Sequence, residues 1–391
     1  MKDAPMSTRP SLLSHTRRSD IVLLTLEFPP RIGGMQQYLF ELCRRLGNEC
    51  NLTVVHPTGD PSQFIGEPFQ LVSFAKDGSG HTSSRTQSSK PPGSGLRWIW
   101  RLARQLAMLR PHLTIVGHAH PRLLLPAALR RGRYMALAYG NDFEAAQLRW
   151  HAPFFNCLLA RAYSLVTISR ANAQRLQDLG LPPPEIVYPG THPDRFFPPA
   201  TPPTGPPILL TVARLVPRKG IDTVIQALPP LLDRSPNLQY WIVGNGPARA
   251  SLERQAQELG VLQAVRFMAE VSDSKLPEIY RRATVFVMPS RADYHAGSVE
   301  GFGIVYLEAS ASGLPVVAAR SGGAAEAVLE NQTGLLVPPD DPQALVEAVS
   351  RLLNDTALRQ RMGRAGRRWV EREMNWDRVG RQFLSIIERA L

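Results

Sequence analysis

The segment VEGFGIVYLEASASGLPVV, residues 299–317, places Glu300 and Glu308 eight residues apart on either side of a glycine-broken apolar run. The run after Gly303 predicts a helix that ends by Gly313. If the residues between the glutamates are all helical, a rise of about 1.5 Å per residue separates the carboxylates by roughly 12 Å along the axis. That exceeds the roughly 5 to 9.5 Å of a carboxyl pair acting at one bond, and it suits two contacts on one elongated ligand. A buried helix with two solvated glutamates is the alternative.

Gly301 and Gly303 lie between the two carboxylates, next to the predicted start of the helix. Glycine lets backbone N–H groups approach a ligand closely, and the start of a helix favours an anion. A sugar, a diphosphate and a ribose joined in line have a shape that fits this arrangement. The segment therefore indicates a site for a ligand of that kind.

Composition bounds the class of protein. The chain has 391 residues, of which 43% are apolar, so two domains with sizeable cores are expected. It contains no run of about 18 apolar residues, and the first twenty residues lack the apolar run of a signal peptide. The three cysteines, Cys43, Cys50 and Cys157, have no CxxC spacing, which argues against a disulfide framework or a structural zinc site. We expect a cytoplasmic protein.

The charge balance favours acidic partners. Lys and Arg number 45 against 33 Asp and Glu, a formal net charge of +12, which suits nucleic acid, anionic lipid or a phosphorylated substrate. The arginines are spread over the whole chain, and no recognisable nucleic-acid motif is present. We therefore expect no nucleic-acid partner.

The pattern along the chain alternates apolar runs with helical periodicity, which is typical of an α/β fold with parallel sheets. A proline-rich segment, residues 189–207, can belong to neither a helix nor a central strand. After it the alternation restarts, so it predicts a linker between two doubly wound halves, with the ligand bound between them. Residues 76–95 are rich in Ser, Gly and Pro and predict a polar loop.

The second half contains the motifs VARLVPRKGIDTVIQAL, WIVGNGPARASLE, EGFGIVYLEASASGLPVVAARSGGAAEAV and TGLLVPPDDPQALVEAV. These motifs closely resemble those of the family 4 glycosyltransferases, which are retaining enzymes of GT-B fold, and within the family they look most like the bacterial lipid mannosyltransferases. It implies two Rossmann-like domains facing each other across a cleft. The acceptor would bind to residues 1–195, to which residues 371–391 cross back, and the nucleotide sugar to residues 196–370.

The resemblance also implies roles for the charged residues. Arg214 and Lys219 would neutralise the donor diphosphate and support the leaving group. The arginine offers a planar guanidinium with several donors, and the lysine offers a compact positive charge. Glu300 would face the hydroxyls of the donor hexose, and Glu308 would take the ribose hydroxyls. Backbone N–H groups toward sugar and phosphate would come from Phe302, Gly303 and Ile304. A solvated basic loop is the alternative for Arg214 and Lys219.

Two glycine pairs match family positions. Gly33 and Gly34 resemble the N-terminal loop that closes over the diphosphate, while Gly244 and Gly246 would line the nucleotide end of the cleft. For each pair a structural turn is the alternative.

The N-terminal half supplies the remaining candidates. His120 best matches the family histidine that contacts the sugar, and His118 is the neighbouring alternative. A purely structural hydrogen bond is the other interpretation of such a histidine. Tyr139 stands where many relatives have a histidine, which leaves open whether Asn141 or Asp142 contributes to acceptor binding. The predicted catalytic set is His120, Arg214, Lys219 and Glu300.

The implied reaction moves a mannose- or glucose-type hexose from a GDP- or UDP-hexose to a hydroxyl of a lipid, glycan or small molecule. No DxD motif is present, so no obligatory metal or other cofactor is expected. An epimerase of GT-B fold and a catalytically idle nucleotide-binding subunit are the alternatives. A dinucleotide oxidoreductase is disfavoured because PRIGGMQQ lacks G-x-G-x-x-G.

Residues 95–111 predict an amphipathic helix, with Trp98, Leu102, Leu106 and Leu109 on one side and arginines among the others. Such a helix could rest on the anionic inner face of a membrane. The alternative is that this stripe is the core face of a domain helix.

Overall fold

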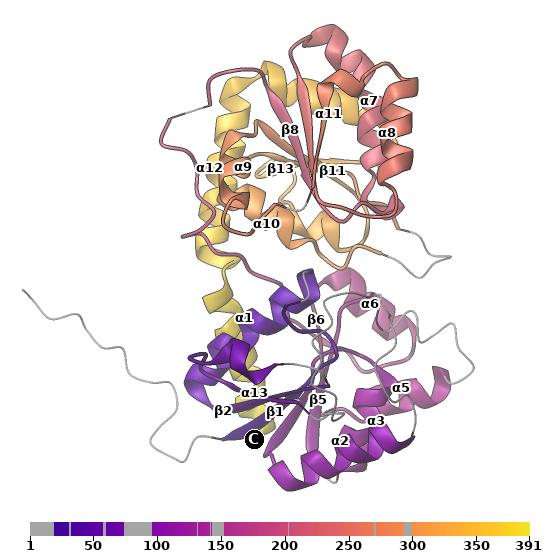
Figure 1. The fold of residues 1–391 in the computed structure, drawn as a ribbon, viewed down its shortest axis with the longest axis vertical. Helices are drawn as coiled ribbons and strands as arrows, with labels where there is room; N and C mark the ends of the chain where they lie inside the picture. The colour runs from indigo at the N-terminus through magenta and orange to yellow at the C-terminus, as the bar shows by residue number, and fades with distance from the viewer. Residues whose placement is uncertain are drawn as a thin grey trace, which may run out of the picture.

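The computed structural model of the protein contains two parallel sheets, one in each half of the chain (Figure 1). The residues described are 19–30, 33–57, 60–73, 96–130, 132–140, 142, 152–201, 203–269, 271–292 and 299–391. The expected polar loop, residues 76–95, lies outside them.

The first sheet has seven strands in the order β3-β2-β1-β4-β5-β6-β7, all parallel. They are β1 (Asp20–Leu24), β2 (Asn51–His56), β3 (Gln70–Ser73), β4 (Leu113–Val116), β5 (Arg133–Ala138), β6 (Ser164–Thr167) and β7 (Glu185–Ile186). Ile21 and Leu23 of β1 belong to the core on one face, and Val22 and Leu24 to the core on the other. Burial on both faces explains why the strand is a continuous apolar run.

Helices cover both faces of this sheet (Figure 1). Those in the N-terminal half are α1 (Gly34–Glu49), α2 (Leu96–Leu109), α3 (Pro121–Leu129), α5 (Ala152–Ala160) and α6 (Arg170–Asp178), with the 3-10 turn η1 (Pro61–Phe64). The core on one face includes α1, and the core on the other includes α2, α3 and α5.

The second sheet has six parallel strands in the order β10-β9-β8-β11-β12-β13. They are β8 (Ile208–Val212), β9 (Gln239–Val243), β10 (Val265–Met268), β11 (Val285–Met288), β12 (Val316–Ala319) and β13 (Gly334–Val337). The strand order reverses between β8 and β11, as it does between β1 and β4, and ligands of open α/β sheets bind beyond the carboxyl ends at such points. The expected α/β fold of two Rossmann-like domains is confirmed.

The helices of the second half also lie on both faces. They are α7 (Ile221–Arg234), α8 (Arg249–Glu258), α9 (Leu276–Arg282), α10 (Ile304–Ala311), α11 (Pro342–Asn354) and α12 (Thr356–Glu373), with the 3-10 turns η2 (Pro217–Lys219), η3 (Leu262–Ala264) and η4 (Gly322–Ala327). One core contains residues of α7, α8 and α11, and the other residues of α9 and α10.

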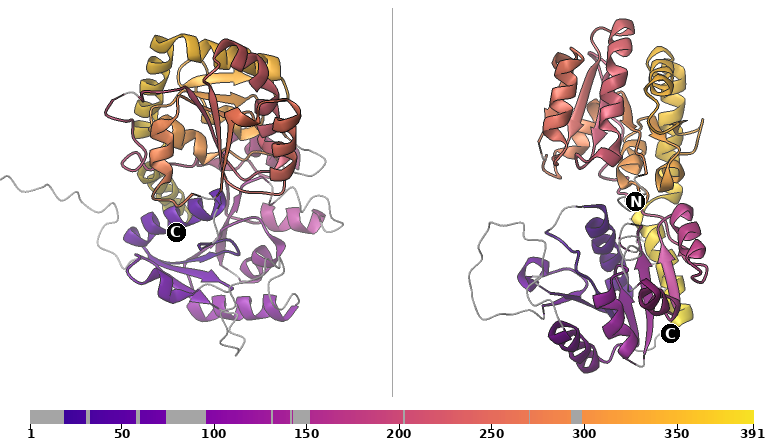
Figure 2. Two further views of the ribbon diagram at one scale, coloured as in Figure 1. Left: turned by 45° about the horizontal axis from the view of Figure 1, so that its top comes forward. Right: turned by 90° about the vertical axis from the view of Figure 1, so that its right-hand side faces the viewer.

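The last helix, α13 (Trp376–Ala390), packs on the first sheet beside α1, although α12 belongs to the second half. The two yellow helices follow one another along the same side of the molecule (Figure 2, right). At the crossing, Thr191 and Asn375 form a parallel bridge. A Cβ atom at Gly190 would lie 2.6 Å from the backbone of Asn375 and Trp376, so only glycine allows this approach.

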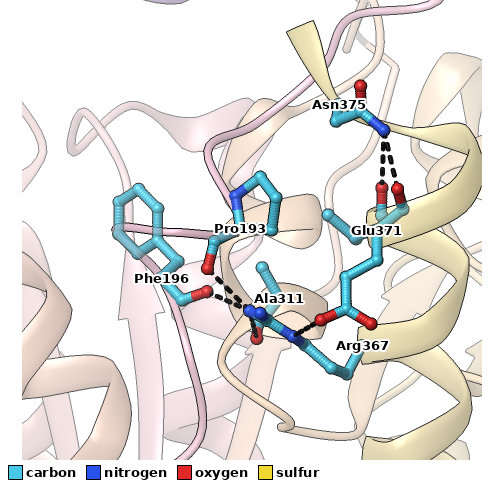
Figure 3. Close-up of polar contacts among 7 residues, drawn as sticks. Pro193, Phe196, Ala311, Arg367, Glu371 and Asn375 are labelled. Carbon is cyan, nitrogen blue, oxygen red and sulfur yellow. Dashed lines mark hydrogen bonds and ion pairs between the residues drawn. The ribbon is translucent and has the colours of Figure 1, made fainter. Parts of the chain in front are cut away.

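Arg367 of α12 binds the linker to the second domain (Figure 3). Its Nη1 donates to the carbonyls of Pro193, Phe196 and Ala311 at 2.8, 2.6 and 3.0 Å. Its Nε pairs with Glu371 at 2.6 Å. Ala311 is the last residue of α10, so one guanidinium satisfies two linker carbonyls and one at the end of this helix.

The two halves meet at the carboxyl ends of their sheets. The carboxylate of Glu326 in η4 accepts from the N–H groups of Arg170 and Ala171, both at 2.8 Å, and from the hydroxyl of Tyr188 at 2.9 Å. A carboxylate at the start of α6 is favourable because it meets the unpaired N–H groups and the positive end of the helix dipole. A Cβ atom at Gly301 would lie 2.6 Å from the carbonyl oxygen of Tyr139, so the backbones of the two halves touch here.

Phe383→Ala tests how strongly α13 supports the first domain. Phe383 is fully buried in the core of that domain, and truncating such a side chain costs about 3–5 kcal/mol because the cavity closes only partly. The free energy of unfolding, measured in urea, should fall by that amount. Glu388→Ala on the exposed side of the same helix is the control, for which about 0.5 kcal/mol or less is expected; equal losses in the two variants would contradict the packing of α13.

Candidate functional site

A buried carboxylate bound by two cations lies beyond the carboxyl ends of β8 and β11. Lys219 Nζ and Arg218 Nη1 both donate to Glu300 Oε2, at 2.5 and 2.6 Å. Glu300 is only 7% exposed and Lys219 only 8%. Lys219 ends η2, directly after the exit of β8, whereas Glu300 belongs to the chain between β11 and α10. The neighbouring positions of β8 and β11 in the sheet bring these distant residues together.

Charge compensation sets the protonation of this cluster. Burial alone would raise the pKa of Glu300, but the charges and hydrogen bonds of Lys219 and Arg218 lower it to about 2. Burial lowers the pKa of Lys219, against the effect of Glu300. Glu300 is therefore an ionised hydrogen-bond acceptor at neutral pH and a weak base.

Two glycines with positive φ allow this geometry. Gly220, with φ of 67°, follows Lys219, and a Cβ atom there would lie 2.1 Å from the carbonyl oxygen of Pro289 at the exit of β11. Gly303, with φ of 92°, immediately precedes α10, and a Cβ atom there would lie 2.6 Å from the ring of Tyr306. Both residues adopt left-handed backbone that favours glycine, and both leave no room for a side chain.

The predicted helix after Gly303 is confirmed, but the condition for the helical separation of Glu300 and Glu308 is not met. Helix α10 begins at Ile304, so Glu300 lies before the helix and residues 300–303 are not helical. The break at Gly303 ends helical continuity, and the rise per residue therefore does not measure the separation of Glu300 and Glu308. The Tyr306 hydroxyl holds the first turns of α10 to β11 by donating to the carbonyl of Met288 at 2.7 Å.

Glu308 has the opposite electrostatic environment from Glu300. It is buried on α10 and accepts from the hydroxyl of Tyr280 on α9 at 2.8 Å. Burial raises its pKa to about 7, against the opposing effects of Tyr280 and Arg195. The two glutamates thus do not share one polar cluster. Glu308 is close to half protonated at neutral pH and can both donate and accept.

Arg214 does not join the basic cluster. Its side chain is exposed, and its backbone carbonyl accepts a hydrogen bond from the N–H of Val216 at 2.9 Å. Arg218 instead shares Glu300 with Lys219. The sequence analysis did not identify Arg218, for which the only indication was its position directly before Lys219. It also did not identify Tyr280, because this residue lies outside the motif that contains its partner Glu308.

The glycine pairs are placed differently from each other. Cβ atoms at Gly244 and Gly246 would lie 2.1 and 2.3 Å from the carbonyl oxygens of Ala213 and Leu215, so contact between the exits of β8 and β9 already requires glycine there. Gly34 begins α1, and a Cβ atom there would meet no atom within 4 Å. Open space at this helix start is compatible with the close approach of an anion.

Two of the predicted donor contacts have buried side chains. The ring of Phe302 lies 5.5 Å from that of Tyr188, and Ile304 belongs to the core of the N-terminal half. The side chains of Phe302 and Ile304 are therefore unavailable to a ligand, and a role for their backbone N–H groups stays a prediction.

His120 and His118 follow β4. His120 is the N-cap of α3, and its Nδ1 accepts from the N–H of Arg122 at 3.2 Å. His118 is buried, and burial, with smaller effects of His120 and His56, lowers its pKa to about 3. His118 is therefore neutral, and His120 has both a capping contact and partial exposure.

Asp142 braces the strand exits of the first sheet. Its Oδ1 accepts from the N–H groups of Tyr139 and Gly140 at 2.9 and 3.0 Å, and its Oδ2 accepts from Ala119 at 2.9 Å. These bonds join the exits of β4 and β5. Asn141, the other predicted acceptor contact, lies outside the described residues.

The described residues contain neither a cluster of metal ligands nor a membrane-spanning helix. Among these residues no group of three or more His, Cys, Asp or Glu side chains is arranged to hold a metal ion. No helix within the described ranges combines the length and apolar character needed to cross a bilayer.

Glu308 should make stability depend on pH. The pKa of Glu308 is about 7 in the folded protein, above its ordinary value of 4.5. Between these pH values the folded protein keeps a proton that the unfolded chain releases. The contribution of Glu308 to stability is therefore complete below pH 4.5 and is lost as the pH rises to 7. Glu308→Gln does not have this loss. As the pH rises from 4.5 to 7, its free energy of unfolding should therefore increase by on the order of 3 kcal/mol relative to that of the wild type. Urea unfolding across this range measures it, and parallel curves would contradict the burial of an uncompensated carboxyl. Tyr280→Phe should extend the loss to higher pH.

The chain matches known proteins over nearly its whole length. Residues 32–195 match the family described as Glycosyltransferase Family 4, and residues 194–369 match Glycosyl transferases group 1. A GDP-mannose-dependent alpha-(1-6)-phosphatidylinositol monomannoside mannosyltransferase of Mycolicibacterium smegmatis is 34% identical over 385 residues, covering 94% of this chain and 98% of that protein. A glycogen synthase of Mycobacterium tuberculosis is 29% identical over 397 residues, covering 92% of each.

Solved structures agree on the fold. Sucrose-phosphate synthase from Thermosynechococcus elongatus superposes with a TM-score of 0.77 at 23% identity, covering 95% of this chain and 99% of that one. Anabaena HepE in complex with UDP-glucose gives a TM-score of 0.76 at 17% identity, covering 95% and 100%. The expected resemblance is thus confirmed: the chain belongs to the family 4 glycosyltransferases (glycosyl transferases group 1) of GT-B fold and is a hexosyltransferase that uses a nucleotide sugar.

Proposed function

We propose that the chain transfers a mannosyl residue from GDP-mannose to a hydroxyl of a lipid-linked acceptor, with retention of configuration and without an obligatory metal ion. The 34% identical relative named as a GDP-mannose-dependent mannosyltransferase of a phosphatidylinositol mannoside supports this donor and this acceptor class. The donor binds to residues 196–370. Residues 1–195, together with residues 371–391, form the acceptor side.

The observation that carries the proposal is the pair of cations on Glu300. Lys219 is buried and Arg218 is partly buried, and an incoming diphosphate can replace the carboxylate as their counter-ion. Binding of the diphosphate would keep Lys219 charged, and it would release Glu300 Oε2 to accept hydrogen bonds from hexose hydroxyls. Exposed Arg214, at the exit of β8, supplies a further fork toward the phosphates. Cations fixed at a departing diphosphate are a major source of rate enhancement.

Glu308 takes the ribose. Its carboxyl group already accepts from the Tyr280 hydroxyl, and a ribose hydroxyl presents the same kind of donor. The N–H groups of Phe302, Gly303 and Ile304 then lie between the two glutamates along the chain, where the phosphates and the hexose would pass. Gly33 and Gly34 bring the start of α1 to the diphosphate from the other domain.

Glu300 is not assigned the role of nucleophile in a transfer that retains the configuration of the sugar. Without a donor, Glu300 has a pKa of about 2 and two cationic partners; once the diphosphate takes over these cations, its Oε2 is assigned to the hexose hydroxyls and not to the reacting carbon. We assign the acceptor proton to the donor phosphate oxygen, on the same face of the sugar. His120 accepts an N–H bond at Nδ1, so its neutral ring carries hydrogen on Nε2 and can donate to a hexose oxygen.

Contact with an anionic membrane is part of the proposal, but through residues other than the predicted stripe. Trp98, Leu102 and Leu106 are buried, so that stripe is the core face of α2. On the exposed side, Trp100 is 69% exposed and Met108 is 60% exposed, beside the exposed arginines Arg97, Arg101 and Arg104. Aromatic and basic side chains together suit the inner face of a cytoplasmic membrane.

A donor-turnover assay tests the proposed reaction. With GDP-mannose and a bacterial lipid extract, release of GDP should depend on the extract and exceed that with UDP-glucose by about tenfold or more, as expected when a site reads polar groups of the base. Radiolabelled mannose should move into the organic phase. Turnover without an acceptor would favour the epimerase, and no turnover with any donor would favour the idle subunit. A preference for UDP-glucose with a glycan acceptor would overturn the assigned donor and acceptor.

Lys219→Ala should lower turnover by about a hundredfold or more, because a preorganised charge at the leaving group is lost. Lys275→Ala, which removes an exposed lysine, is the matched control and should retain turnover. Circular dichroism checks that both variants fold. A decrease of less than threefold in a folded Lys219→Ala protein would refute the role of Lys219.

A further inference from the structure

A second concave site lies at the opposite edge of the C-terminal sheet from Glu300. It is a cavity of about 810 Å³ whose wall includes Pro207, Thr284 and Pro315. These residues directly precede β8, β11 and β12, so the cavity is at the amino ends of these strands. Strands of four or five residues at about 3.3 Å per residue place roughly 13–17 Å between the two edges. The donor site does not include this cavity.

Arginine supplies every charge that lines the cavity. Among the described residues its lining contains no Asp, Glu or Lys, and its charged members are Arg234, Arg281, Arg359, Arg364, Arg367 and Arg368. The arginines come from α7, α9 and α12, which are separate in the sequence. Like charges gathered in a concave wall repel one another and raise the local concentration of anions.

Some of these arginines are already hydrogen-bonded within the protein, whereas others are free to contact a ligand. Arg367 is bonded to three carbonyls and Glu371 (Figure 3). Arg359 donates to the carbonyls of Leu352 and Leu353 at 2.7 and 3.1 Å. By contrast, Arg364 and Arg368 are exposed, and within the described part of the chain no hydrogen bond or ion pair is recorded for their side chains. Four residues apart on α12, they lie on the same face of the helix.

The rest of the wall is built to stay open. Pro198, Pro199 and Pro203 of the linker form one side, and proline restricts the backbone there. Gly363 brings α12 close to the end of α10, since a Cβ atom there would lie 2.0 Å from the carbonyl oxygen of Gly313. The cavity thus combines a preformed shape with exposed arginine donors.

We infer that this cavity binds a compact polyanion with two or more closely spaced phosphate groups, as an accessory site separate from the donor site. Its volume falls within the roughly 300–1,000 Å³ that small-molecule sites occupy. Guanidinium groups match phosphate oxygens in pairs, and several of them can share one polyphosphate. The phosphates can belong to a soluble molecule or to a cluster of lipid headgroups.

Calorimetric titration of the full chain with inorganic tripolyphosphate tests the inference. The wild type should bind two equivalents, one at Lys219 and one at the arginine-lined cavity. Lys219→Ala should lose one equivalent and keep the other. Adding Arg364→Gln and Arg368→Gln to that variant should raise the remaining dissociation constant by about tenfold or more, the effect expected from losing two charge-assisted contacts.

Arg361→Gln with Arg372→Gln is the matched control, because both arginines are exposed on α12 and neither lines the cavity. It removes the same net charge and should change the dissociation constant by less than about threefold. Equal weakening by the two pairs would overturn the inference, whereas loss of all tripolyphosphate binding in Lys219→Ala alone would exclude the soluble source of phosphate.

Flotation with phosphatidylglycerol vesicles separates the two sources of phosphate. If tripolyphosphate binds as described, the soluble source is supported. If only vesicles bind, and Arg364→Gln with Arg368→Gln weakens this binding clearly more than the control pair does, the headgroup source is supported; the weakening is partial because α2 is proposed to contact the membrane as well. Binding of neither probe to the cavity would overturn the inference. Because these readouts use no sugar donor or acceptor, they stand apart from the proposed mannosyl transfer.

Discussion

The geometry of the functional site depends on one buried carboxylate that compensates two cations. Lys219 is buried here with Arg218 partly buried beside it, and the lysine needs a partner to stay charged, since removing one member of a buried ion pair costs about 3–5 kcal/mol. Glu300 supplies that partner at 2.5 and 2.6 Å. The protein thus holds two cations in place before any anion arrives. In the proposed function, an anionic ligand exchanges with Glu300 and does not have to organise the site.

Helix α10 connects the parts of the C-terminal domain that carry charge. Gly303 precedes its start, Glu308 lies along it, and the carbonyl of Ala311 at its end is bound by Arg367. The start of the helix faces the donor side, whereas the residues just after its end, Ser312 and Gly313, line the arginine-lined cavity. One short helix therefore lies between the two sites that are proposed to bind phosphate.

The two glutamates of the motif differ because their surroundings differ. Both are buried, and burial alone raises the pKa of each. Glu300 has two cations within hydrogen-bonding distance, so its charge is stabilised. Glu308 has only the neutral hydroxyl of Tyr280 at that distance among its recorded bonds, so its proton is retained to about pH 7. The same residue type therefore suits ion pairing at one position and exchange of hydrogen bonds with neutral hydroxyls at the other.

The sequence by itself determined the α/β fold, because strands buried on both faces must be apolar throughout, as β1 is, and this pattern is local. It also determined the family, through contiguous motifs such as the one containing Glu300 and Glu308. Only the tertiary structure decided that Arg218 rather than Arg214 reaches Glu300, that Tyr280 binds Glu308, and that the arginines of α7, α9 and α12 line one cavity. These contacts join residues far apart in the chain, and their geometry follows from the order of strands and the packing of helices, which no local pattern specifies.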